Sequence, residues 1–296
     1  MKVVYGHTDS IYVQIDSVES AQEKILEIQD YVREFFPNEM GLEQHPVVLE
    51  FEKYYSSLGV GTVKNRNAGL VSWEDGIWLE KPKFTMTGFT AKRISETQFA
   101  RELQTNILKK WVNAESENEL VKFLFETYSD VLNGKIPFEK FVKRSRLKEN
   151  RFTVKCSECN SKYSLRECLT LPHKVCSKCA TGTSNFITLE GKKPSIGSGV
   201  AGVLYAWEHQ NKTFDDNYLS LKVIGTGTFT HPLTHEIKVA EYVSGTEMND
   251  FKNYMPDWRH YAEEVVNKAE PVFDSMGWDI SSIRNGKIQK KLEEWF

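Results

Sequence analysis

Apolar and polar positions alternate over the first part of the chain. Residues 3–6 and 11–15 carry alternating apolar side chains on either side of a polar turn, which predicts a β-hairpin. Residues 46–60 alternate in the same way and predict a strand. The turn at residues 74–76 predicts a second hairpin after it.

Helical spacing follows these runs. Apolar residues recur three and four positions apart in four segments, which predicts helices over 18–36, 95–113, 115–133 and 257–276. A Gly- and Ser-rich stretch, KKPSIGSGVAGVLYAW, leads into another helix, and residues 219–244 alternate weakly, as strands do. We therefore predict an α+β fold: an antiparallel sheet with helices, followed by a mainly helical region with an inserted cysteine module.

Composition and charge narrow the function classes only slightly. The chain has 296 residues, 40% of them hydrophobic, and a net charge of −3, which is ordinary for a soluble protein. No apolar run is long enough for a membrane span, and the first residues lack the layout of a signal peptide. We expect an intracellular chain, cytoplasmic or nucleoid-associated, with no membrane partner.

One segment is strongly basic. Residues 140–155 hold seven Lys or Arg and a single acid. Such a run could contact phosphates, or it could be the solvated face of a helix and loop, and charge alone does not separate the two.

Four of the five cysteines form two C-x-x-C pairs with sixteen residues between them. The four are Cys156, Cys159, Cys176 and Cys179. In an intracellular chain this spacing predicts a structural Zn²⁺ site with four thiolate ligands rather than disulfides. The alternative is a loop of reduced cysteines without metal. The fifth, Cys168, is expected to be a buried small hydrophobe.

The turn of the first hairpin carries Asp9. A carboxylate at a hairpin tip suits Mg²⁺, which prefers oxygen ligands, but aspartate and serine also cap turns through their own backbone.

The surrounding string, YGHTDSIYV, resembles the Y-G-D-T-D-S motif of family B DNA polymerases. The resemblance implies that Asp9 binds the catalytic Mg²⁺ ions, with His7, Thr8 and Ser10 near the site. His7 stands where the family has its first, less critical aspartate, and imidazole is a poor Mg²⁺ ligand. We therefore place His7 beside the site and do not count it as a ligand.

Three further strings extend the resemblance. LEFEKYY (49–55) is similar to the family's L-E-F-E-K-V-Y strand and implies Glu52 as a second carboxylate at the site, with Glu50 as the alternative. KNRNAGL (64–70) is similar to K-K-R-Y-A-G-L, which implies that Lys64 and Arg66 contact the primer–template backbone. Asn65 and Asn67 depart from that pattern.

TGFTAKRISE (87–96) resembles the family's junction between palm and thumb, with Lys92 and Arg93 as DNA contacts and Ile94 in place of an aspartate. IPFEKFVKRSRL and YAEEVVNKAEPVFDSMGWDISSI resemble thumb helices in order and spacing. Lys143, Arg144 and Arg146 are accordingly expected to bind DNA.

The last residues, QKKLEEWF, resemble the box that binds sliding clamps of the PCNA type. The residues that fit it are Gln289, Leu292, Trp295 and Phe296. The alternative is an ordinary amphipathic helix end that packs on its own domain.

These matches imply a palm portion (1–86), a thumb (87–284) with a zinc-ribbon-like insert (152–185), and a clamp-binding tail (285–296). The family's exonuclease, fingers and first palm aspartate would have to come from an N-terminal polymerase part. We expect a subunit or fragment of a DNA-directed DNA polymerase that is inactive as this chain alone. The alternatives are a non-catalytic zinc-bearing accessory protein that binds DNA and a clamp, or a zinc-ribbon protein with a chance hairpin.

Overall fold

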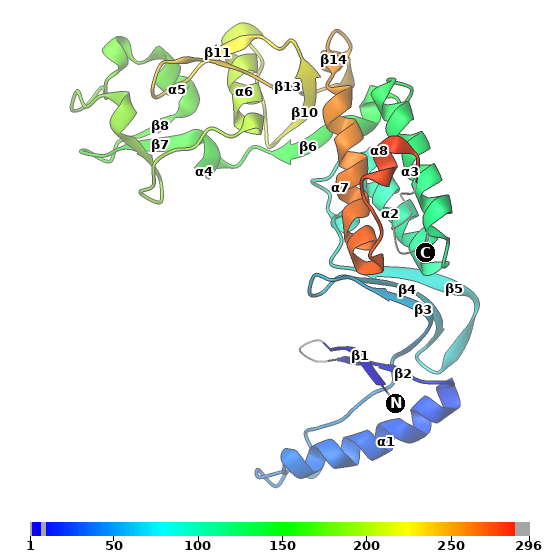
Figure 1. Cartoon of the computed structure of the whole chain (residues 1–296). Coiled ribbons are helices and arrows are strands. Elements are labelled where there is room, and N and C mark those ends of the chain that lie inside the picture. The colour runs from blue at the N-terminus through cyan, green and yellow to red at the C-terminus, as the bar shows by residue number, and fades with distance from the viewer. Residues whose placement is uncertain (1, 7–9, 288–296) are drawn as a thin grey trace.

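The structure is a computed structural model that describes residues 2–6 and 10–287. Its elements follow an arc (Figure 1). A hairpin and one helix lie at the N-terminal end of the arc, a three-stranded sheet and a layer of helices come next, and a second lobe forms the other end. Within the described residues, no helix is both long enough and apolar enough to cross a membrane.

The first hairpin is confirmed. Strands β1 (Lys2–Gly6) and β2 (Ile11–Gln14) pair antiparallel in a two-stranded sheet of their own. Helix α1 (Val18–Phe35) follows, and the side chain of Ser17 caps its first turn. Only Val18 and Ala21 of this helix are buried, so the N-terminal end of the arc has almost no core of its own.

The second hairpin is also confirmed. Strands β3 (Lys53–Val60), β4 (Asn67–Glu74) and β5 (Ile77–Thr87) form an antiparallel sheet in the order β3-β4-β5. Asp75 and Gly76 turn the chain between β4 and β5, and both have positive φ angles, as the twist of a tight hairpin requires.

The strand predicted over 46–60 is wrong in its first half, because β3 begins only at Lys53. The backbone before it bonds to side chains of α1. Arg33 Nε donates to the carbonyl oxygen of Val47 (3.0 Å), and the N–H of Leu49 donates to Gln29 Oε1 (2.9 Å). These side chains take the place of a neighbouring strand, so the alternating pattern continues without sheet pairing.

The helical layer packs on the sheet and forms the larger core. It comprises α2 (Gln98–Val112), α3 (Glu117–Leu132), α7 (Trp258–Met276) and the short α8 (Ser282–Asn285). Thr97 caps α2, and Ser116 with Glu119 forms a capping box on α3. The predicted helices 18–36, 95–113, 115–133 and 257–276 are therefore confirmed to within a few residues.

One prediction of the thumb region is wrong. The segment IPFEKFVKRSRL is not a helix: a 3₁₀ turn (Phe138–Phe141) leads into strand β6 (Lys143–Arg146). Strand β6 pairs antiparallel with β10 (Asn217–Ile224), more than seventy residues away, and this pairing overrides local helical spacing.

The second lobe contains the cysteine segment. Its elements are α4 (Glu149–Phe152), β7 (Thr153–Cys156), β8 (Lys162–Ser164), α5 (Leu165–Thr170), β9 (Phe186–Thr188), α6 (Ser198–His209), β11 (Thr228–Thr230), β12 (Ile237–Val239), β13 (Tyr242–Gly245) and β14 (Met255–Pro256). The sheets are β8-β7-β9, β11-β12, and β13-β10-β14 with β6 on β10.

A second hydrophobic core joins the cysteine segment to α6 and to β11. Phe152, Phe186, Val203, Leu204 and Phe229 are among its buried members. The cysteine segment is thus packed into a larger lobe. With antiparallel sheets and helices throughout, the predicted α+β class is confirmed.

Candidate active site and metal-binding residues

The first hairpin is tied to the loop that carries Lys64 and Arg66. The hydroxyl of Tyr5 donates to Asn65 Oδ1 (2.9 Å), and the backbone N–H of Asn65 donates to the same hydroxyl (3.0 Å). These two bonds join segments that are sixty residues apart in the sequence. They fix where the basic loop lies relative to the hairpin.

The same loop is fixed from its other side by Gly88. Asn65 has a φ of 66°, in the left-handed region that asparagine tolerates better than most residues. A Cβ at Gly88, whose own φ is +75°, would lie 1.9 Å from the carbonyl oxygen of Asn65. Only glycine permits this approach. The structure therefore brings together three segments that the sequence singled out: the hairpin, residues 64–70 and residues 87–96.

The basic side chains of these segments are accessible. Lys64, Lys92 and Arg93 are exposed and Arg66 is half-buried. Lys92 closes a 3₁₀ turn (Thr90–Lys92) that leads into α2. Among the described residues, none of these four cations is held in an ion pair. Their charges are free to meet an anionic partner.

A different ion pair stabilises this junction. Lys268 of α7 lies 2.9 Å from Glu96, and its ammonium also donates to the Thr90 hydroxyl (2.9 Å). Gln104 Oε1 accepts from the backbone N–H of Ala91 (2.7 Å). The segment between the sheet and α2 is thus held by both α2 and α7, although Ile94 replaces the aspartate of the family motif and is 81% exposed.

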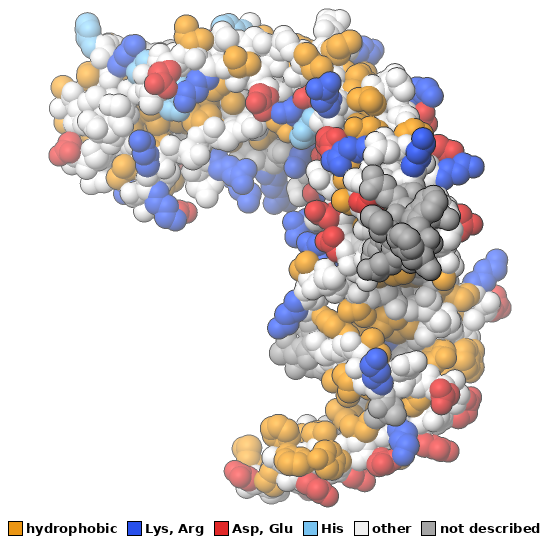
Figure 2. Space-filling model, viewed as in Figure 1, with side chains coloured by type: hydrophobic (Ala, Val, Ile, Leu, Met, Phe, Trp, Pro, Cys, Tyr) orange, Lys and Arg blue, Asp and Glu red, His pale blue; other side chains and the backbone are white. Residues whose placement is uncertain are grey.

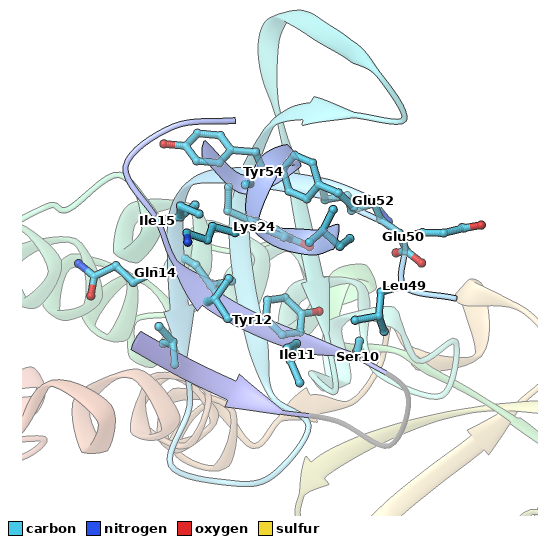
Figure 3. A pocket seen from close by; sticks show the side chains of 18 of the residues that line it. Ser10, Ile11, Tyr12, Gln14, Ile15, Lys24, Leu49, Glu50, Glu52 and Tyr54 are labelled. Carbon is cyan, nitrogen blue, oxygen red and sulfur yellow. The ribbon is translucent and has the colours of Figure 1, made fainter. Parts of the chain in front are cut away.

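The predicted carboxylates lie beside a cavity between the hairpin, α1 and the start of β3. The cavity measures about 750 Å³ and is lined by Ser10, Glu50 and Glu52 together with apolar side chains. Figure 3 shows Ser10, Leu49, Glu50 and Glu52 toward one end of it and Lys24 toward the other.

Glu50 and Glu52 are both exposed, whereas Leu49 and Phe51 are partly buried, so the two carboxylates lie on the same side of an extended segment. Glu52 immediately precedes β3, and its carbonyl oxygen accepts from the N–H of Asp75 (3.1 Å). The structure therefore brings both glutamates to the end of the cavity where the described part of the hairpin resumes at Ser10.

Aromatic rings connect the hairpin to the sheet. The ring of Tyr12 lies 5.4 Å from that of Tyr5 and 6.0 Å from that of Tyr55. Burial raises the pKa of Tyr12, and the neighbouring Tyr55 and the negative charge of Glu52 raise it further. Tyr12 therefore stays neutral at physiological pH and packs the hairpin against β3.

The tip of the hairpin lies outside the described residues. This applies to His7, Thr8 and Asp9, and equally to the tail residues Gln289, Leu292, Trp295 and Phe296. Of the carboxylates predicted to bind Mg²⁺, the structure describes Glu52 and its alternative Glu50, whose oxygen atoms are the kind of ligand that a hard cation prefers.

The basic run of residues 140–155 forms part of the concave side of the arc. In β6, Arg144 and Arg146 are exposed while Lys143 and Ser145 are partly buried, as the alternation of a strand dictates. Figure 2 shows Lys and Arg side chains gathered on the concave side where the second lobe meets the helical layer. The run spans the end of a 3₁₀ turn, strand β6, the short helix α4 and the start of β7, so it is not one helix face, and its contact with phosphates stays a prediction.

The four cysteines converge. Their Sγ atoms all lie within 4.8 Å of one another, with Cys156 and Cys179 at 3.4 Å and Cys159 and Cys176 at 3.5 Å. Tetrahedral Zn²⁺ with bonds of about 2.3 Å needs sulfurs about 3.8 Å apart, so the cluster fits this ion.

The two C-x-x-C turns have the same backbone geometry. The carbonyl oxygens of Cys156 and Cys176 accept from the N–H groups of Asn160 (3.1 Å) and Ala180 (2.9 Å), both of which have φ near +57° to +58°. Each turn thus presents two sulfurs to one point, which is the arrangement of a zinc knuckle pair.

Hydrogen bonds favour the thiolate at Cys176. Burial alone would raise its pKa, but Tyr163 and the backbone N–H groups of Lys178 and Cys179 lower the pKa of Cys176 to about 6. Tyr163 Oη lies 3.1 Å from the sulfur. By contrast, burial raises the pKa of Cys168 to about 12, and this fifth cysteine lies outside the cluster and is fully buried, as predicted.

Sequence reasoning missed four residues that position these sites: Tyr5, Asn65, Gly88 and Tyr163. Asn65 departs from the family motif, so the motif gives it no role. Its positive φ and its bonds to Tyr5 depend on tertiary contacts that no local pattern reveals. Gly88 belongs to the segment TGFTAKRISE, but the contact that requires glycine is visible only in the fold.

Comparison with known proteins gives three matches. The model of the family "DNA polymerase family B" matches residues 1–162, more than half of the chain. DNA polymerase 037L of Invertebrate iridescent virus 6 is 25% identical over 174 residues, which are 52% of this chain and 13% of that protein.

The third match is structural. The family B DNA polymerase from the archaeon Pyrobaculum calidifontis superposes with a TM-score of 0.50 and 17% identity, over 92% of this chain and 26% of the archaeal chain. This likeness concerns the fold alone. The chain spans about an eighth of the viral protein and a quarter of the archaeal one.

Proposed function

The chain belongs to DNA polymerase family B, and from this membership we propose that it supplies the last portion of the palm and the thumb of a DNA-directed DNA polymerase. In this role it grips primer–template duplex and completes a nucleotidyl-transfer site with an N-terminal polymerase part. That part carries the exonuclease, the fingers and the first palm aspartate.

One observation carries the proposal. The Tyr5–Asn65–Gly88 contacts join the metal-binding hairpin, the Lys64–Arg66 loop and the Lys92–Arg93 turn. A polymerase needs its carboxylates at a fixed distance from the residues that hold the primer backbone, because the reacting oxygen belongs to the primer end. A chance hairpin would have no reason to be bonded to a basic loop that in turn packs against a second basic segment.

Asp9 and Glu52 are the proposed Mg²⁺ ligands, with Glu50 as the alternative to Glu52. When bound, the metal ions activate the primer 3′ oxygen and neutralise charge on the triphosphate. The residues of this chain provide carboxylate oxygens on one side and, through Lys64 and Arg66, hold the primer–template backbone on the other.

The proposed partner would cover the N-terminal end of the arc. Val3, Val4 and Ile11 of the hairpin are 48–61% exposed, and Leu26, Tyr31 and Phe35 of α1 are 62–64% exposed. An isolated two-stranded sheet with a nearly coreless helix is only marginally stable in water. A partner that adds palm strands would bury these side chains and fill the cavity beside Glu52.

The proposal also includes the domain boundaries, the zinc site, the clamp-binding tail and the location in the cell. The boundaries 1–86, 87–284 and 285–296 separate palm, thumb and tail, and residues 152–185 bind structural Zn²⁺. The tail binds a sliding clamp through Gln289, Leu292, Trp295 and Phe296. The protein works inside the cell, on the nucleoid.

Asp9→Asn tests the role of the hairpin. In the enzyme reconstituted with the N-terminal part, we expect this substitution to abolish synthesis and to leave duplex binding nearly unchanged, because it removes a metal ligand and leaves the basic residues intact. Asp16→Asn, the same substitution at an exposed aspartate that does not line the cavity, is the matched control. DNA synthesis by Asp9→Asn at the rate of the control would refute the assignment.

The second candidate is a non-catalytic adaptor that binds duplex DNA and a clamp. The substitution of His7 for a family aspartate favours it. A metal-binding measurement separates the two functions: a catalytic hairpin takes up Mn²⁺ in the reconstituted protein and loses it in Asp9→Asn, whereas an adaptor takes up none there in either form.

A further inference from the structure

The second lobe contains a basic cavity that the proposed function does not use. It measures about 480 Å³ and lies between α4, the loop after β9, the start of α6 and Tyr218 of β10. Its lining includes three cations, Arg151, Lys192 and Lys193, and one acid, Glu190. The cavity therefore favours an anion.

Two of the cations are available to a ligand. Lys192 lies 3.1 Å from Glu190, which offsets its charge. Arg151 and Lys193 are exposed, and among the described residues neither is held in an ion pair. The cavity thus keeps the equivalent of two unpaired positive charges.

A buried hydroxyl points at the cavity. Tyr218 is only 4% exposed, and a Cβ at Gly199 would lie 3.0 Å from its hydroxyl oxygen. Burial raises the pKa of Tyr218, while a hydrogen bond with Ser145, its partner across the β6–β10 pair, and the positive charge of Arg151 lower it. A hydroxyl can donate one bond and accept two, which leaves Tyr218 able to donate to a ligand oxygen.

The backbone adds donors at the same place. Helix α6 begins after Gly197, and no side chain caps its first turn. Glycines at 197 and 199 leave the N–H groups of that turn open to an approaching group. Cations, a buried hydroxyl and free N–H groups therefore line one cavity.

The cavity continues the exposed basic strip of β6. Arg144, Arg146 and Lys148 precede Arg151 along the chain, and all four are exposed. A polyanion with regularly spaced charges fits such a line better than a single small anion does.

We propose that this cavity binds a backbone phosphate of the DNA duplex, so that the second lobe extends the grip beyond the palm and the helical layer. The inference rests on the proposed function in one respect, that the chain binds duplex DNA. Arg151 and Lys193 neutralise the phosphate, and Tyr218 with the first turn of α6 donates hydrogen bonds to its oxygens.

The test is the salt dependence of duplex binding by the full chain, measured by fluorescence anisotropy. Each neutralised phosphate contributes a slope of about −0.9 in a plot of log K against log salt. We expect Arg151→Gln with Lys193→Gln to make the slope shallower by about 0.9, the value for one phosphate, and to weaken binding on the order of tenfold at low salt. Tyr218→Phe should weaken binding a few-fold without changing the slope.

A matched control uses the same change of charge elsewhere on the lobe. Lys162→Gln with Lys174→Gln removes two exposed cations that do not line the cavity. An unaltered slope in the cavity variant, or equal changes in cavity and control variants, would overturn the inference.

Two further measurements show whether the bound phosphate belongs to DNA or to a free polyphosphate, and separate failure of this inference from failure of the proposed function. If inorganic triphosphate binds the cavity while the cavity variants bind duplex normally, the site belongs to a free polyphosphate and the inference is wrong. Lys64→Gln with Arg66→Gln tests duplex binding at the palm. A loss there with no loss in the cavity variants would refute the cavity and leave the proposed function standing.

Discussion

At the scale of single residues, departures from a family motif can have structural roles of their own. Asn65 stands where the family has a lysine, yet its side chain and backbone both bond to Tyr5. Its positive φ suits asparagine, and its carbonyl oxygen packs against Gly88. The substitution exchanges one positive charge for a fixed position of the neighbouring Lys64 and Arg66.

Gly88→Ala should displace the basic loop. The new Cβ would meet the Asn65 carbonyl oxygen, and the positive φ adds strain of about 1–2 kcal/mol. We expect a lower melting temperature and weaker duplex binding.

Gly76→Ala is the control, because Gly76 also has a positive φ but nothing lies within 4 Å of its Cβ position. Equal effects of the two substitutions on duplex binding would show that the contact with Asn65 has no role.

Tyr5→Phe should loosen the hairpin from the loop. It removes both bonds to Asn65, each worth about 0.5–1.5 kcal/mol. We expect a several-fold lower rate of synthesis in the reconstituted enzyme with helical content unchanged by circular dichroism. Tyr128→Phe, which removes a hydroxyl bond to Glu263 in the helical layer (3.2 Å), should leave the rate unchanged. A normal rate in Tyr5→Phe would contradict the positioning role.

At the scale of elements, the periodicity of apolar residues predicts the helices whose formation depends on nearby residues. The long helices follow from their apolar spacing and their caps at Thr97 and Ser116. The predictions are wrong where contacts with distant segments determine the backbone conformation. The backbone of Val47 and Leu49 bonds to side chains of α1, and residues 143–146 pair with β10. These partners lie far away in the sequence, so the local pattern of apolar and charged residues is compatible with more than one secondary structure.

The cysteine segment shows the same division. The spacing of the two C-x-x-C pairs predicts that the four sulfurs converge, and they do. The size of the lobe that depends on them was not predictable, because the second core also uses α6 and β11.

Removal of zinc should therefore unfold more than residues 152–185. Cys156 and Cys176 are 0–1% exposed and belong to the second core, so charged thiolates without metal would be buried there at high cost. On chelation we expect hydrogen exchange to rise across residues 152–240 while α2 and α3 stay protected.

Matched cysteine variants check the metal itself. Cys176→Ser should bind almost no zinc, whereas Cys168→Ala should keep one ion per chain, because Cys168 lies outside the cluster. Full zinc content in Cys176→Ser, or unchanged exchange after chelation, would contradict the structural role of the site.

At the scale of the whole molecule, neither hydrophobic core of the described residues includes the N-terminal end of the arc. Both hydrophobic cores lie after residue 67. Apolar side chains of the hairpin and of α1 are exposed to solvent, and other apolar side chains line the cavity beside Glu52. A group of Lys and Arg side chains lies on the concave side where the second lobe meets the helical layer, and others lie on the convex side (Figure 2). This distribution is what a part of a larger enzyme needs: a charged surface for duplex and an apolar one for the rest of the palm.

The most direct test of that account is primer extension by this chain alone and by the chain mixed with the N-terminal polymerase part. The account predicts extension only in the mixture, because it assigns Asp9 and the duplex grip to this chain and the other palm aspartate to the N-terminal part. Extension by the chain alone would contradict the shared active site. No extension in the mixture, with duplex binding retained, would contradict catalysis and leave the chain as an adaptor for DNA and a clamp.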